Sequence, residues 1–136
     1  MQKQPLLFAL LCLLFLGAGT ADNALGQGTA KTEETVIAAL KAADGQRIAD
    51  VLNDLVDLDL PQYRGTYSKA QAGKLITDFL GGKKFTDFKL LRKGQVAEKE
   101  QYTLAEIKSE GQTYRVYFVV KDKDGKGLVP VFRITR

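Results

Sequence analysis

The stretch Thr113-Tyr114-Arg115-Val116-Tyr117-Phe118-Val119-Val120 decides the fold of this chain. All of its residues except Arg115 are β-branched or aromatic, which predicts a strand. Side chains alternate between the two faces of a strand. One face therefore carries Tyr114, Val116, Phe118 and Val120, and the other carries Thr113, Arg115, Tyr117 and Val119. Turn-forming pairs flank the stretch at residues 110–111 and 124–125, which predicts the middle strand of an antiparallel meander.

Further strands are predicted on both sides of this one. The expected ranges are residues 85–93, 101–109, 113–121 and 128–135, with a loop over residues 94–100. Pro130 lacks the backbone N–H that a central strand needs, so the last strand is expected to lie at a sheet edge or to contain a bulge.

The first half of the chain carries helical signals. Thr32 is expected to cap a helix that ends at Gly45, and Asp44 to cap a second helix that runs to about residue 53. Residues 56–60 alternate as a short strand, and residues 61–66 read as a loop. Ser68 and Gln71 form a capping box for a third helix, which ends at the glycine pair 81–82.

These elements predict an α+β domain with one core. Three amphipathic N-terminal helices followed by strands bury their apolar faces most simply when the helices lie across one concave face of a curved antiparallel sheet. The expected shape is a cone with four to five strands, formed by residues 32–136.

The N-terminus is predicted to be a signal peptide. Lys3 precedes an apolar run over residues 6–16, and small residues follow, with cleavage expected after Ala21. The run is shorter than the ~20 residues that span a bilayer, so we expect no stable membrane insertion. Residues 22–31 are polar and read as a disordered lead-in. The protein is therefore expected to be exported, to the periplasm or the outside of the cell.

Cysteine and histidine are scarce. Cys12 is the single cysteine and lies in the middle of the apolar run, which argues against lipid attachment. The mature chain would then have neither a disulfide nor a thiolate ligand. The sequence contains no histidine, the usual general base near neutral pH and the commonest metal ligand. We therefore predict no catalytic residues, no metal and no cofactor.

Charge argues against a nucleic-acid partner. Without Lys3, 19 basic and 16 acidic residues remain, a net charge of +3. Both signs are interspersed, whereas a nucleic-acid binder concentrates cations on one face.

Three charged groups are candidate sites. Asp54, Asp57 and Asp59 are suited to a calcium ion or a base, but alternation places two of them on a solvated strand face. Residues 122–127 resemble the start of a calcium loop but lack its later ligands, so a hairpin turn is the better interpretation. A basic cluster over residues 83–93 is suited to a polyanion or to plain solvation.

Tyrosines and arginines form the most suggestive set. The candidate ligand-binding residues are Tyr63, Arg64, Tyr67, Tyr102 and Arg115. Amphipathic tyrosines beside an arginine suit a small polar ligand at the opening of a cone. The alternative interpretation is that these tyrosines pack in the core or at its rim.

Short motifs connect the chain to a known family. Residues 67–72 (Tyr-Ser-Lys-Ala-Gln-Ala), residues 111–116 (Gly-Gln-Thr-Tyr-Arg-Val) and the closing residues 132–134 resemble a small secreted bacterial family, domain of unknown function four-seven-eight-three. The resemblance covers residues 35–136. It implies the nuclear transport factor two-like (cystatin-like) cone fold and an exported location, and it implies no activity.

The sequence supports three functional hypotheses. The first is a non-catalytic module that binds a small ligand or a protein. The second is a cone-fold enzyme that uses a buried carboxylate and a tyrosine for proton transfer or hydrolysis. The third and weakest is association with a polyanion or a membrane surface. A homodimer through the sheet face that carries Tyr117 and Val119 is also expected.

Overall fold

A computed structural model describes residues 27–136 of the chain. The predicted signal peptide, its cleavage position Ala21 and residues 22–26 lie outside the described residues. The helices are α2 (Gln27–Lys41), α3 (Gly45–Ala49) and α4 (Lys69–Leu80). The strands are β1 (Leu52–Asp59), β2 (Arg64–Ser68), β3 (Thr86–Ala97), β4 (Glu100–Ser109), β5 (Gln112–Lys123) and β6 (Lys126–Thr135).

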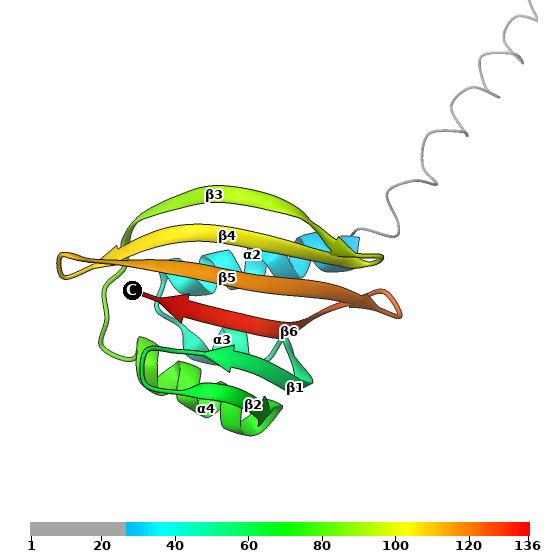
Figure 1. Cartoon of the computed structure of the whole chain (residues 1–136), viewed down its shortest axis with the longest axis horizontal. Coiled ribbons are helices and arrows are strands. Elements are labelled where there is room, and N and C mark those ends of the chain that lie inside the picture. Colours follow the sequence, from blue (N-terminus) through cyan, green and yellow to red (C-terminus); the bar gives the residue numbers. More distant parts are fainter. Residues whose placement is uncertain (1–26) are drawn as a thin grey trace, which may run out of the picture.

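Six strands form one curved sheet in the order β2-β1-β6-β5-β4-β3 (Figure 1). Strand β5 is antiparallel to both β4 and β6, so the predicted meander around residues 113–120 is confirmed. The expectation of a purely antiparallel sheet is wrong, because β1 runs parallel to β6. A strand from the first half of the chain thus lies beside the last strand. No local sequence pattern predicts this pairing.

Residues 64–66, which the sequence predicts as part of a loop, belong to strand β2. It pairs antiparallel with β1, from Leu55 opposite Ser68 to Asp59 opposite Arg64. Two backbone hydrogen bonds of 2.7 and 3.2 Å between Leu60 and Tyr63 close the turn between the two strands. An edge strand with little apolar content has no periodic signal, so only the pairing reveals it.

Helix boundaries also differ from the predictions. Residues 27–31, expected at the end of a lead-in, belong to α2, so Thr32 is not its cap. The second helix ends at Ala49, because residues 52–55 extend β1 instead. Two predicted caps are confirmed. The Arg47 N–H donates to the Asp44 carboxylate, and the Gln71 N–H donates to the Ser68 hydroxyl oxygen, each at a distance of 3.3 Å.

Strand β3 is longer than predicted. It continues to Ala97, through residues that were expected to form a loop. Gly94 in its last third lies opposite Tyr102 of β4, whose ring covers the space that a side chain would fill. Pro130 lies in the central strand β6 where the pairing with both neighbours shifts register, so the bulge is confirmed and the edge position is wrong.

The core lies between one face of the sheet and the helices. Tyr114, Val116, Phe118 and Val120 are buried, as predicted, together with Leu40 of α2, Ile76 of α4 and further apolar residues of the same cluster. Figure 1 shows α2 and α3 behind the sheet. Burial of a phenylalanine such as Phe118 contributes roughly 1.5–3 kcal/mol, so this face supplies much of the stability.

We call the opposite face of the sheet the open face. By register it carries Tyr102, Leu104 and Glu106 of β4, Arg115, Tyr117 and Val119 of β5, Val131 and Arg133 of β6, and Asp57 and Asp59 of β1. Within residues 27–136, no helix combines the length and apolar character needed to cross a bilayer.

Candidate functional site

The five predicted ligand-binding residues do not form one site. Tyr63 and Arg64 lie at the turn between β1 and β2, and Tyr67 is on the helix-covered side of β2. Tyr102 and Arg115 lie on the open face. The structure therefore separates them into three places, only two of which have side chains available to a ligand.

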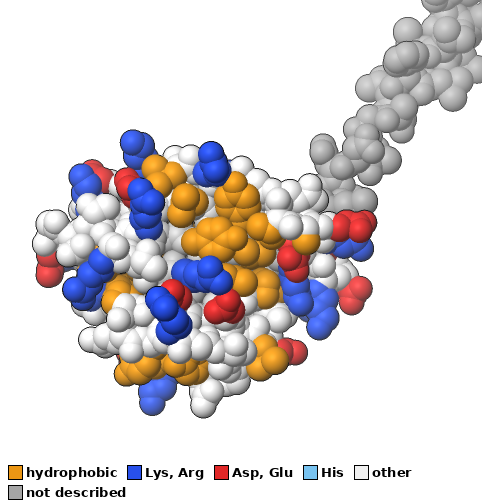
Figure 2. Space-filling model, in the orientation of Figure 1, with side chains coloured by type: hydrophobic (Ala, Val, Ile, Leu, Met, Phe, Trp, Pro, Cys, Tyr) orange, Lys and Arg blue, Asp and Glu red, His pale blue; other side chains and the backbone are white. Residues whose placement is uncertain are grey.

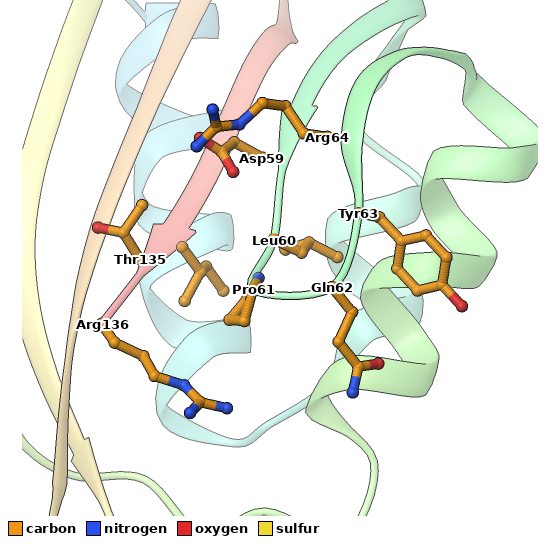
Figure 3. Close-up of a pocket in the computed structure, with 9 residues that line it drawn as sticks. Asp59, Leu60, Pro61, Gln62, Tyr63, Arg64, Thr135 and Arg136 are labelled. Atoms are coloured by element: carbon orange, nitrogen blue, oxygen red, sulfur yellow. The ribbon is translucent and has the colours of Figure 1, made fainter.

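The turn between β1 and β2 borders a pocket of about 520 Å³ (Figure 3). The loop residues, the C-terminal residues Thr135 and Arg136, and Asp59 line it. Arg64 forms an ion pair with Asp59 at 3.3 Å, and its side chain is 81% exposed. Tyr63 points away from Arg136 in Figure 3. An exposed ion pair in a wide hollow offers little that would orient a small ligand.

Tyr67 is partly buried and packs against the core. It lies opposite Val56 of β1, which is completely buried, and packs against the main apolar cluster. This position agrees with the alternative that the sequence left open, in which a tyrosine packs at the rim of the core.

A row of interacting side chains crosses the open face. The rings of Tyr102 and Tyr117 stack with centroids 5.8 Å apart and an angle of 26° between their planes. The Arg133 guanidinium lies 5.7 Å from the Tyr117 ring centroid and donates to Asp57 over 2.8 Å. We call these four residues the aromatic–arginine row.

Strand register explains why the row forms. Tyr102 lies opposite Val119, which is two residues along β5 from Tyr117, so the two tyrosines are diagonal neighbours. Tyr117 lies directly opposite Arg133. Diagonal neighbours on one sheet face are within reach of aromatic side chains. At the β3 end, Tyr102 lies so close to Gly94 that a Cβ on Gly94 would be 2.6 Å from its ring. The missing side chain lets the tyrosine lie flat on the sheet.

Apolar residues surround the row. Leu104, Val119 and Val131 lie on the same face as the row, where Val119 is buried and the other two are half-buried. Figure 2 shows hydrophobic side chains gathered at the centre of this face, with lysines and arginines around them. A second ion pair, Arg115 to Glu106 over 3.7 Å, borders the patch. Stacked tyrosines, an arginine and a ring of charge are the usual composition of a protein-binding surface.

The sequence predicted part of this surface. Tyr102 and Arg115 are among the candidate residues, and the sequence predicts Tyr117 and Val119 at a dimer interface. Arg133 and Asp57 were missed as partners, because 76 positions separate them in the chain and the parallel β1–β6 pairing was not foreseen. The signal available was Asp57 itself, which alternation already placed on a strand face opposite to the core.

One acidic residue is buried in the described part of the chain. Glu33 of α2 is 8% exposed, and its carboxylate accepts from the Lys93 ammonium of β3 over 2.6 Å. This pair ties the helix to the edge strand. Among residues 27–136, no three acidic, histidine or cysteine side chains gather closely enough to hold a metal ion.

The family model described as "Domain of unknown function (DUF4783)" matches residues 33–135. The chain belongs to the DUF4783 family. The resemblance that the sequence motifs suggested is thereby confirmed, and the function of this family is unknown. A search of curated proteins finds no match.

Solved structures share the fold of this DUF4783 protein. A DUF4783 protein from Bacteroides uniformis is 21% identical, with a TM-score of 0.68 over 76% of this chain and 94% of that chain. Another from Bacteroides ovatus is 20% identical, with a TM-score of 0.66 over 74% and 90%. An NTF2-like protein from Cytophaga hutchinsonii is 17% identical, with a TM-score of 0.55 over 77% and 92%. The NTF2-like α+β fold follows from these comparisons.

Proposed function

We propose that this DUF4783 domain is an exported, non-catalytic binding module that associates with a second copy of itself through the open face. The aromatic–arginine row carries the proposal. Tyrosine and arginine dominate binding energy at protein interfaces because they combine large contact area with polar groups that fix orientation. The row places both residue types at the centre of a broad sheet face.

The arrangement of the face favours a two-fold partner. In an isologous interface the same patch meets itself, so a patch at the middle of the face can pack around the symmetry axis. The ion pairs of the face, Arg115 with Glu106 and Arg133 with Asp57, each offer both signs of charge to a second copy. Neither pair presents a single-sign field that would repel an identical surface.

A non-catalytic role has its own support. The enzyme alternative requires a carboxylate enclosed beside a tyrosine hydroxyl. Among the described residues, the buried carboxylate is that of Glu33, and it forms an ion pair with the Lys93 ammonium group. Because the sequence contains no histidine, the chain offers no general base with an ordinary pKa near neutral pH.

Sedimentation of a charge-bearing variant tests the proposal. We expect the wild-type protein to sediment as a dimer at micromolar concentrations and Tyr117→Glu to sediment as a monomer, because the change removes the central aromatic ring and association would have to take a carboxylate out of water. Tyr63→Glu is the matched control, since Tyr63 is 46% exposed at the β1–β2 turn and should leave the dimer intact. A monomeric wild-type protein, or equal effects of both changes, would contradict self-association through this face.

A further inference from the structure

The edge strand β3 is a second surface, separate from the open face. It pairs with β4 on one side, and in the described part of the chain no strand pairs with its other side. Figure 1 shows it as the outermost strand, with its long side uncovered by the described elements. β3 has 12 residues, whereas β2 at the opposite edge has 5. A long edge presents unpaired backbone N–H and C=O groups that can accept another strand.

Side chains of β3 are unusually exposed. Five large hydrophobic residues are exposed in the described part of the chain, and three of them lie on this strand. These are Leu90, Leu91 and Val96, with 46%, 37% and 47% of their surface exposed. Apolar side chains beside an open backbone edge provide contacts for the alternating residues of an added strand.

Charge along this strand selects among possible partners. β3 contains three basic residues, Lys89, Arg92 and Lys93, and one acidic residue, Asp87, and two more lysines precede it at positions 83 and 84. By register, Lys89 lies opposite Glu106, and Arg92 lies opposite Leu104, on the open-face side. Glu106 pairs with Arg115, and Lys93 on the other side pairs with Glu33. Within residues 27–136, Lys89 and Arg92 form no ion pair. The edge therefore attracts negative charge.

The same charges disfavour a second copy at this edge. Two β3 strands paired antiparallel around a two-fold axis would bring their basic segments against each other, and like charges on paired strands are destabilising. The register also shifts between Leu90 and Arg92, which interrupts a flat edge. Lysines and a bulge are the devices that keep edge strands from pairing with themselves.

We propose that β3 binds an extended acidic peptide segment of another protein by strand addition, in register with residues 92–95. This part of the β3–β4 ladder is regular. Acidic residues at every second position of the segment would lie on the side of Lys89 and Arg92. The intervening apolar residues would lie on the side of Leu90 and of Lys93, whose charge Glu33 balances. The backbone edge supplies affinity, and the cations select an acidic sequence.

A pair of synthetic peptides tests this inference on the purified protein. The probe alternates glutamate and valine, and its control alternates lysine and valine at the same length. Binding is followed by fluorescence anisotropy at physiological salt, and hydrogen exchange reports which amides become protected. We expect the glutamate peptide alone to bind and to protect the amides of β3 that point away from β4.

Charge reversal at the edge provides the matched variants. Lys89→Glu/Arg92→Glu should weaken binding about tenfold, because two attractions become repulsions. Lys123→Glu/Lys126→Glu makes the same change in charge at exposed positions of the β5–β6 turn and should leave binding unchanged. Equal melting temperatures of the two variants would show that both are folded.

The other outcomes overturn the inference. Binding of heparin to these residues, without amide protection by the glutamate peptide, would identify a polyanion patch instead of a strand-binding edge. Binding of neither probe, or protection confined to the open face, would reject the edge as a binding surface. The test is independent of the proposed dimer, because Tyr117→Glu removes the dimer without changing the charge of β3.

Discussion

Arg133 and Asp57 form a 2.8 Å ion pair on the open face although 76 positions separate them in the chain. The pair connects β6 with β1, the parallel neighbours of the sheet. Its arginine also lies on the Tyr117 ring, with 5.7 Å between the guanidinium carbon and the ring centroid. The bond thereby fixes the position of the arginine in the aromatic–arginine row.

A double-mutant cycle on Asp57→Ala and Arg133→Ala should show a weak coupling. Both side chains are nearly half exposed, and pairs of this kind contribute about 0.5 kcal/mol. Urea unfolding of the two single variants and the double variant measures the coupling. Asp54→Ala, an exposed acidic residue of the same strand, is the control and should show no coupling with Arg133→Ala. A coupling of several kcal/mol would mean that the pair is far more enclosed than its exposure indicates.

The hydroxyl of Thr32 should matter more than that of Thr35. Thr32 is 7% exposed and donates to the Gly127 carbonyl of β6 over 2.9 Å, which joins α2 to the sheet. Thr32→Val leaves that carbonyl without its donor, so we expect the free energy of unfolding to fall by about 1–2 kcal/mol. Thr35 donates to Lys31 within its own helix at an exposed position.

Thr35→Val is therefore the control for this change. It alters one exposed hydroxyl and should change stability by less than about 0.5 kcal/mol. Thermal and urea unfolding of both variants provide the comparison. Equal losses in the two proteins would show that the contact between α2 and β6 contributes nothing particular to stability.

Phe118 should be among the most costly positions to truncate. Its side chain is fully buried at the centre of the core, so Phe118→Ala removes apolar contacts and leaves a cavity. We expect a loss of about 3–5 kcal/mol in the free energy of unfolding, measured with urea. Leu55→Ala is the comparison, because Leu55 is 63% exposed and its loss should cost less than about 0.5 kcal/mol. A small effect at Phe118 would be incompatible with the core described above.

Export can be tested by mass. Expression of the whole chain in a bacterium should yield a periplasmic or extracellular product that begins at Asp22, since Ala21 ends the predicted leader. Ala21→Glu places a large charged residue at the cleavage position and should cause accumulation of the uncleaved chain. Intact mass spectrometry of fractionated cells measures both. Recovery of the full-length chain from the cytoplasm alone would contradict the prediction.

Local chemistry of the sequence determined the elements whose signals are strong. The β-branched run over residues 113–120 formed a strand with the expected buried face, because side-chain alternation follows from backbone geometry alone. Ser68 and Asp44 cap their helices because a short polar side chain satisfies amides that any helix leaves free. The family motifs, and with them the α+β class, were likewise readable from the residues.

Only the tertiary structure decided which segments lie side by side. The parallel contact of β1 with β6, the strand β2, and the meeting of Arg133 with Asp57 depend on pairings across the whole chain. Gly94 shows the same dependence, because the Tyr102 ring of the neighbouring strand fills the space that a side chain at position 94 would need. Local propensity describes the energy of one segment at a time. The open face and the β3 edge exist only because backbone hydrogen bonds between distant segments align their side chains into one surface.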